Sequence, residues 1–143
     1  MTIMIGNKTK IVIPVCVLLV ILIAFSVKHF NMSSGSGNFN ITRSIELNTK
    51  NSMRMYYHSF SGNKYTLMNL RKGDKLVLNV SVTTKQGDLK VSLDNGNNKE
   101  LFSTENPQKT VTKTININET DNYKLQVSGK HKGSFYVKWR VES

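Results

Sequence analysis

Residues 76–94 read LVLNVSVTTKQGDLKVSLD, and this stretch decides the fold class. Apolar and mainly polar residues alternate on both sides of TKQG, residues 84–87. A period of two is typical of strands that bury one face. Closing residues 84–87 as a hairpin loop sets apolar residues opposite each other throughout: Val82 and Leu89, Val80 and Val91, Leu78 and Leu93. The pattern therefore predicts two antiparallel strands, 76–83 and 88–94.

Residues 123–141 repeat the same pattern around GKHKG, residues 129–133. Closing this loop joins strands 123–128 and 134–141. The apolar partners are then Val127 and Phe135, Leu125 and Val137, Tyr123 and Trp139. A slip of one residue would turn every one of these side chains to the opposite face, so the register is well specified. We expect a second hairpin here.

Weaker strand patterns separated by Gly, Asn and Asp turns fill the rest of the chain. They fall near residues 44–48, 53–60, 64–70, 99–103 and 110–117. About eight to nine short strands over about a hundred residues are typical of an all-β, antiparallel β-sandwich, here jelly-roll-like. The side chains expected at the centre of its core are Leu78, Val80, Val91, Leu125, Val127, Phe135, Val137 and Trp139.

The N-terminal part has a different character. Residues 11–27 form an apolar run without charge, and Lys8 and Lys10 precede it. A helix that crosses a membrane needs about 17 to 25 such residues, and preceding lysines favour a cytosolic N-terminus. We expect a single-pass anchor at the cell membrane with the C-terminal domain outside. The alternative is secretion after cleavage near Ser26, because Ala24 and Ser26 are small residues that suit a signal peptidase.

These patterns divide the chain into a cytosolic N-terminus (1–10), an anchor or signal segment (11–27), a flexible stalk (28–43) and a β-sandwich domain (44–143). The stalk is inferred from its Ser-Gly repeats and lack of periodicity. Cys16 is the single cysteine of the chain, so the domain holds no internal disulfide. Cys16 lies early in the apolar run, whereas lipid attachment requires a cysteine at its end.

The turn residues also carry a resemblance to a family. Lys72-Gly73-Asp74 opens one strand, Asp121-Asn122-Tyr123 opens another, and Gly133-Ser134-Phe135 follows. This arrangement resembles the small exported β-sandwich modules of the pre-peptidase C-terminal and GOLD type, as in uncharacterised membrane-anchored or secreted proteins of low-GC Gram-positive bacteria. The resemblance covers about residues 60–142. It implies a sandwich fold and a non-catalytic accessory or interaction role.

Residues for catalysis or metal binding do not group in the sequence. His29, His58 and His131 fall in the stalk, a strand and a hairpin loop, and no pair has the spacing of metal ligands. Residues 94–100, DNGNNKE, lack the alternating acids of a calcium loop. We expect no enzyme activity, no metal and no cofactor. A secreted enzyme is the least favoured alternative.

Charge is the remaining functional signal. The chain carries a net charge of +11, and removing Lys8 and Lys10 leaves +9 on the part expected outside the membrane. The second hairpin sets Lys124 opposite Lys138, and like charges across a sheet are unfavourable. One interpretation is a surface that meets a polyanion such as teichoic acid or anionic lipid. Its candidate residues are Lys90, Lys124, Lys138 and Arg140.

We favour the simpler interpretation, in which the basic residues form a solvated face that keeps a surface protein soluble. The domain is then expected to be a cell-surface or envelope interaction module whose ligand the sequence does not identify, and another envelope protein is a candidate partner. Nucleic acid is not expected, because few aromatic side chains accompany the basic ones.

Overall fold

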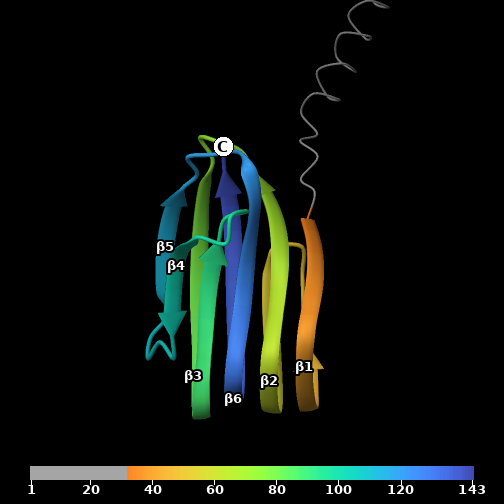
Figure 1. Ribbon diagram of the computed structural model, residues 1–143. Helices are drawn as coiled ribbons and strands as arrows, with labels where there is room; N and C mark the ends of the chain where they lie inside the picture. Colours follow the sequence, from red (N-terminus) through yellow and green to blue (C-terminus); the bar gives the residue numbers. More distant parts are fainter. Residues whose placement is uncertain (1–31) are drawn as a thin grey trace, which may run out of the picture. The chain divides into compact units, whose positions relative to one another are not determined.

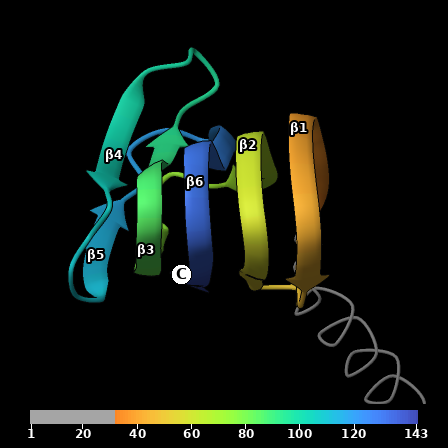
Figure 2. The ribbon, with the colours of Figure 1, turned by 90° about the horizontal axis from the view of Figure 1, so that it is seen from below.

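The computed structural model describes residues 32–143, and every regular element in this part is a β-strand. The strands are β1 (Met32–Glu46), β2 (Ser52–Leu70), β3 (Lys75–Asp94), β4 (Glu100–Glu105), β5 (Val111–Asn116) and β6 (Asp121–Glu142). They form one antiparallel, six-stranded sheet in the order β1-β2-β6-β3-β4, with β5 also paired to β3. Seen from below, β1, β2, β6 and β3 lie side by side in this order, and β4 and β5 lie beyond β3 (Figure 2).

The four long strands bend near their middles, and the bends fold the sheet into two layers. Along β3, the first half pairs with β5 and the second half pairs with β4. We call the layer that contains β5 the β5 layer; it also holds residues 52–57 of β2 and 133–142 of β6. The β4 layer holds residues 62–70 of β2 and 121–129 of β6. Figure 1 shows the two layers one in front of the other, so the described domain is a β-sandwich.

Three irregularities in the pairing lie at the level of the bends, and a fourth lies between β3 and β4 at Leu93 and Asp94. The register shifts between Ser36 and Phe39 in β1, between Tyr57 and Phe60 in β2, and between Thr84 and Gln86 in β3. In each case the named strand has one more residue than its partner, which is a β-bulge. Bulges increase bending and twist, so three bulges at one level explain why these strands turn there together.

Two glycines show why the bends need this sequence. Gly133 of β6 has a φ of 145° and Gly87 of β3 has a φ of 81°, a region that residues with a side chain rarely adopt. A Cβ at Gly133 would also overlap the carbonyl oxygen of Thr83, and a Cβ at Gly87 that of Lys130. These strands pass so close to each other at the bend that only glycine fits.

Both predicted hairpins are therefore wrong. Residues 84–87 and 129–133 are bends inside β3 and β6, not loops between strands. Within the sheet, Val80 lies opposite Val137, Leu78 opposite Trp139, and Leu93 opposite Leu125. The hairpin prediction paired apolar residues because the same inner face continues through each bend. In β3 the bulge moves the buried positions from even to odd residue numbers, just as a tight turn would.

The alternation itself was interpreted correctly, because it marks the buried face of each layer. All eight residues predicted for the centre of the core are 0–2% exposed. The structure adds buried residues from β2 that the weaker patterns did not single out: Met53, Met55, Phe60, Met68 and Leu70. The short strands predicted on either side of each bend merge, so the expected eight or nine strands become six.

The predicted stalk needs correction in its described part. Residues 32–43 belong to β1, which pairs with β2 from Met32–Met68 to Glu46–Met55. The small residues have a packing role here, because a Cβ at Gly35 would overlap the ring of Tyr65, and one at Gly37 would overlap Asn63. The two glycines thus leave room for the side chains of Tyr65 and Asn63, which lie over β1. The predicted anchor, residues 11–27, lies outside the described residues.

Candidate functional site: a basic face and an interlayer cavity

The four predicted polyanion-binding residues lie on two different faces of the sandwich. Lys90 and Lys124 lie on the outer side of the β4 layer, whereas Lys138 and Arg140 lie on the outer side of the β5 layer. The expected pairing of Lys124 with Lys138 is wrong, because both residues belong to β6. Lys124 lies opposite Asp94 of β3 instead, which is a favourable pair.

The outer face of the β5 layer is basic. Two more cations join Lys138 and Arg140 here. Arg54 of β2 lies opposite Tyr136 and is therefore a diagonal neighbour of Lys138 on β6. Lys75 of β3 lies opposite Glu142 of β6. These four basic side chains and the acidic Glu142 sum to a charge of +3, and Arg43 and Lys85 line a pocket with Tyr56 at one end of this face. Within the described residues only Arg140 of the four has an ion pair, with Glu142 at 2.6 Å. We call this surface the basic face.

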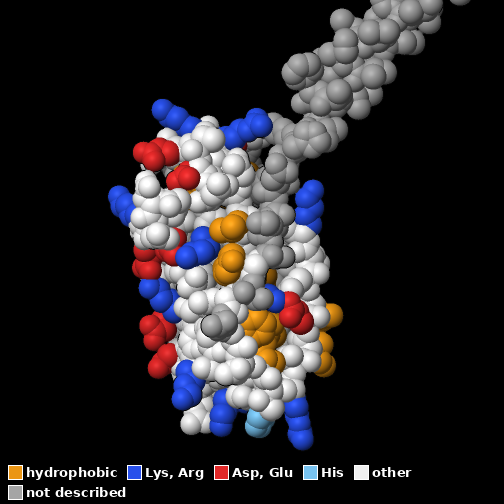
Figure 3. Space-filling model, turned by 45° about the vertical axis from the view of Figure 1, so that its right-hand side comes forward, with side chains coloured by type: hydrophobic (Ala, Val, Ile, Leu, Met, Phe, Trp, Pro, Cys, Tyr) orange, Lys and Arg blue, Asp and Glu red, His pale blue; other side chains and the backbone are white. Residues whose placement is uncertain are grey.

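Two tyrosine side chains lie on the basic face. The guanidinium carbon of Arg54 lies 4.0 Å from the ring centroid of Tyr136, a cation–π contact. Tyr56, two residues after Arg54 on the same strand, is 47% exposed. Ile45 of β1 lies opposite Tyr56, and both Ile45 and Leu47 are exposed. Figure 3 shows hydrophobic side chains at the surface among basic and acidic ones. Arg54 and Lys75 were not predicted from the sequence because both lie outside the two strongest strand patterns, residues 76–94 and 123–141.

The outer face of the β4 layer has a different balance. Lys90 and Lys124 are accompanied there by Asp94, Glu100 and Glu105, so the charges sum to −1. Lys90 Nζ lies 2.5 Å from Glu100 Oε2, and this partner raises the pKa of Lys90. Lys90 is therefore paired with Glu100 and Lys124 lies opposite Asp94. These two predicted polyanion-binding residues have acidic neighbours.

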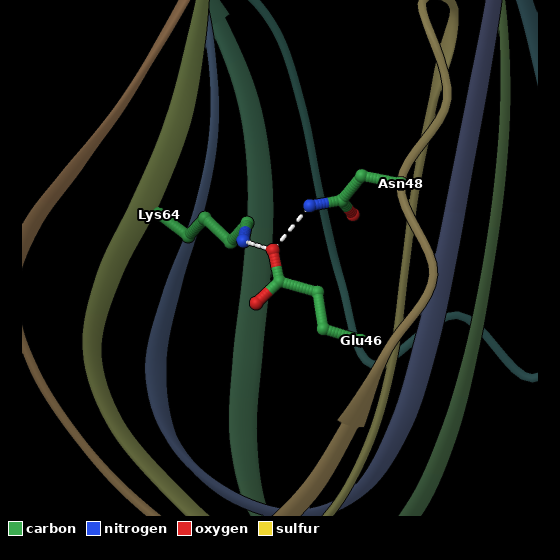
Figure 4. A network of polar contacts seen from close by, with 3 residues as sticks. All are labelled: Glu46, Asn48 and Lys64. Atoms are coloured by element: carbon green, nitrogen blue, oxygen red, sulfur yellow. Dashed lines mark hydrogen bonds and ion pairs between the residues drawn. The ribbon is translucent and has the colours of Figure 1, made fainter.

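A cavity of about 360 Å³ lies between the layers on the side of β1. Residues of both layers line it, among them Glu46, Ser52, Lys64 and Trp139. Lys64 stands in β2 at an inward position, and only 8% of it is exposed. Its ammonium group contacts Glu46 Oε1 at the end of β1, and the same oxygen accepts a hydrogen bond from Asn48 Nδ2. Figure 4 shows these three side chains converging from separate segments.

The cavity holds unusual polar groups for a sandwich core. Burial lowers the pKa of the Lys64 ammonium, because the charged form loses its water. The indole Nε1–H of Trp139 is buried and has no hydrogen-bond partner among the described residues. Buried polar groups without partners are rare and call for an explanation. Lys64 was not predicted from the sequence. Its spacing of two residues from Thr66, Met68 and Leu70, which are all buried, is the signal that could have placed it on the inner face.

A third polar group lies where the layers join. His131, predicted in a hairpin loop, is 2% exposed. Its Nδ1 lies 2.6 Å from Tyr57 Oη and its Nε2 lies 2.9 Å from Thr84 Oγ1. Burial lowers the pKa of His131, with Asp88 opposing the shift, and burial raises the pKa of Tyr57. Phe60 and Phe135 pack around Tyr57, so these groups stabilise the bend.

Within residues 32–143 no group of three His, Cys, Asp or Glu side chains is arranged to hold a metal ion. The same residues contain no helix long and apolar enough to cross a membrane.

No protein-family model matches the chain, and no curated protein matches it. Solved structures with a similar arrangement include the family 11 carbohydrate-binding module of cellulosomal cellulase Lic26A-Cel5E of Clostridium thermocellum, at 14% identity and a TM-score of 0.40 over 76% of this chain and 84% of that one. They include the secreted serine protease VesC from Vibrio cholerae, at 15% identity and a TM-score of 0.48 over 73% of this chain and 25% of that one. A third is the carbohydrate-binding module CBM36 in complex with calcium and xylotriose, at 12% identity and a TM-score of 0.43 over 78% of this chain and 98% of that one.

These likenesses are too distant to assign a family. The neighbours named are carbohydrate-binding modules and a protease, not modules of the pre-peptidase C-terminal or GOLD type. What stands of the earlier resemblance is a small β-sandwich module.

Proposed function

We propose that this chain is a non-enzymatic, extracytoplasmic β-sandwich module that binds an anionic cell-wall polymer of the teichoic-acid type through its basic face. The observation that supports this most directly is the grouping of Arg54, Lys75, Lys138 and Arg140 on one outer face, where they and Glu142 sum to a charge of +3. The apolar run at residues 11–27 would hold the module at the membrane, beside such polymers.

The geometry of a sheet suits a linear polymer with regularly repeated charges. Side chains two residues apart on one strand lie about 6.8 Å apart, and neighbouring strands lie about 4.8 Å apart. Lys138 and Arg140 therefore offer two cations along β6, and Arg54 adds one on the adjacent strand. Several weak contacts made at once give useful affinity on the outer face of a sheet.

The experiment compares two double variants with the same change in charge. Binding of the full chain to purified wall teichoic acid is measured at low and high salt. Arg54→Glu/Lys138→Glu should weaken binding about tenfold or more, because it sets like charges against the polymer. Lys90→Glu/Lys124→Glu, on the other face, should change it less than about twofold, since these residues lie among acids.

Binding of the unaltered chain should also fall steeply with salt, as for any contact between exposed charges. Equal losses in the two double variants would show that only net charge matters, and the basic face would then have no special role. Binding to phosphatidylglycerol vesicles but not to the polymer would assign the face to a lipid surface instead.

A further inference from the structure

The interlayer cavity contains a buried hydrogen-bond donor that has no partner among the side chains that the structure describes. Trp139 is 2% exposed, and it lines the cavity. Its Nε1–H is the one fully buried side-chain polar group without a partner among the described side chains. Elsewhere in this core, buried polar side chains are paired, as His131 is with Tyr57 and Thr84. An indole N–H left unpaired beside a cavity is the arrangement expected where a ligand supplies the acceptor.

The charged groups at the cavity restrict the kind of ligand. Lys64 and Glu46 form an ion pair across the two layers. An anionic ligand would meet the carboxylate of Glu46, and a cationic ligand would meet the ammonium of Lys64. Since the pair is neutral as a whole, a neutral ligand avoids both repulsions.

The same two residues offer donors and acceptors side by side. The Lys64 ammonium has three N–H groups and needs acceptors, whereas Glu46 Oε2 has no partner among the described residues and needs a donor. A hydroxyl group can both donate and accept. Met53 and the Trp139 ring provide apolar walls on the same cavity, so the ligand should carry C–H surface as well as hydroxyl groups.

We infer that the cavity between the layers binds one sugar residue, or a neutral polyhydroxylated ligand of that size, with an oxygen accepting from Trp139 Nε1 and hydroxyl groups contacting Lys64 and Glu46. A volume of about 360 Å³ lies at the lower end of the range for small-ligand sites. This site is separate from the basic face and goes beyond the function proposed above.

The chain contains a single tryptophan, which makes a direct test possible. In ¹⁵N-labelled full-length protein, kept in a detergent without a sugar headgroup, the indole N–H gives one cross-peak. The probes are N-acetylglucosamine and the methyl glycosides of glucose, galactose and mannose, titrated to about 50 mM, well above a millimolar Kd. At least one should shift the indole peak saturably, whereas sodium acetate at equal concentration should not.

Two lysine variants locate the effect. Lys64→Met removes the inward donor while keeping the length of the side chain, and it should weaken glycoside binding about tenfold or more. Lys124→Met, on the outer side of the same layer, is the matched control and should bind like the unaltered chain. Arg54→Glu/Lys138→Glu should also bind the glycoside normally, so failure of the basic face and failure of the cavity are distinguishable.

Three results would overturn the inference. No probe shifts the indole peak; acetate shifts it as the glycosides do; or Lys64→Met binds the glycoside with unchanged affinity. The dispersion of the other amide peaks shows in each case whether the variant is folded.

Discussion

The two outer faces of the sandwich are made by the same long strands, yet they carry different charge. On the β5 layer the strands present four cations and one acid, and on the β4 layer they present two cations and three acids. The inner faces of both layers are mainly apolar, although that of the β4 layer also carries Lys64 and Thr66. Both halves of a bent strand such as β6 thus contribute apolar side chains to the core, but their outward side chains differ in charge. The charge of each outer face can therefore change without changing the core.

The largest expected effect comes from the shared core. Trp139→Ala removes the largest buried side chain of the β5 layer, and it should lower the free energy of unfolding by about 3–5 kcal/mol. Chemical denaturation followed by circular dichroism measures this. Leu101→Ala, at a position 38% exposed, is the control and should change it by less than about 0.5 kcal/mol. A loss below about 1 kcal/mol for Trp139→Ala would mean that the ring does not join the two layers.

The next effect tests whether the layers are continuous through the bends. Gly133→Ala should destabilise the fold by about 1–3 kcal/mol, because it combines a φ of 145° with a clash against the Thr83 carbonyl. Gly73→Ala is the matched control, since Gly73 also has a positive φ, 95°, but has open space around its Cβ position. Thermal unfolding of the two variants separates the steric clash from backbone strain. Equal losses would argue against a close approach of β6 and β3 at this bend.

The difference between the faces can be sharpened with two tyrosines. Tyr136→Ala removes the ring under Arg54 on the basic face. It should weaken teichoic-acid binding about two- to fivefold, the value of an exposed cation–π contact of about 0.5–1 kcal/mol. Tyr65→Ala, on the outer side of the β4 layer, should leave binding unchanged. If both tyrosine variants bind alike, the Arg54–Tyr136 contact does not prepare the face for its polymer.

The sequence patterns identified the core residues but not how the strands connect: they predicted hairpins where β3 and β6 are continuous, bent strands. The alternation around Leu78 and Trp139 was sufficient to mark both as buried, because burial depends on the period of the pattern. It could not distinguish a tight turn at Gly87 from a bulged bend, since both insert residues and both favour glycine. That one ambiguity placed Lys124 opposite Lys138 and merged two faces into one predicted site. Lys138 and Arg140 lie on one face because they are two residues apart in a single strand.

The smallest effect concerns the bend itself, where neither face contributes. Burial lowers the pKa of His131 in the folded state, whereas the unfolded chain has a histidine pKa of about 6.5. As the pH falls below about 6.5, the unfolded state binds more protons than the folded state, so the free energy of unfolding decreases until the lowered folded pKa is passed. His131→Gln can keep hydrogen bonds to Tyr57 and Thr84 but cannot titrate.

Urea denaturation between pH 7.5 and 5.5 should therefore show a slope for the unaltered chain that is reduced in His131→Gln. Carboxylates contribute little in this window, because their ordinary pKa values lie near 4. The carboxylate of Asp88 and the ammonium groups of Lys130 and Lys132 are the charges near His131 in the sheet, and they are the same in both proteins. If the two slopes agree, His131 is accessible to protons in the folded state, and the layers do not enclose it as the buried Tyr57–His131–Thr84 arrangement requires.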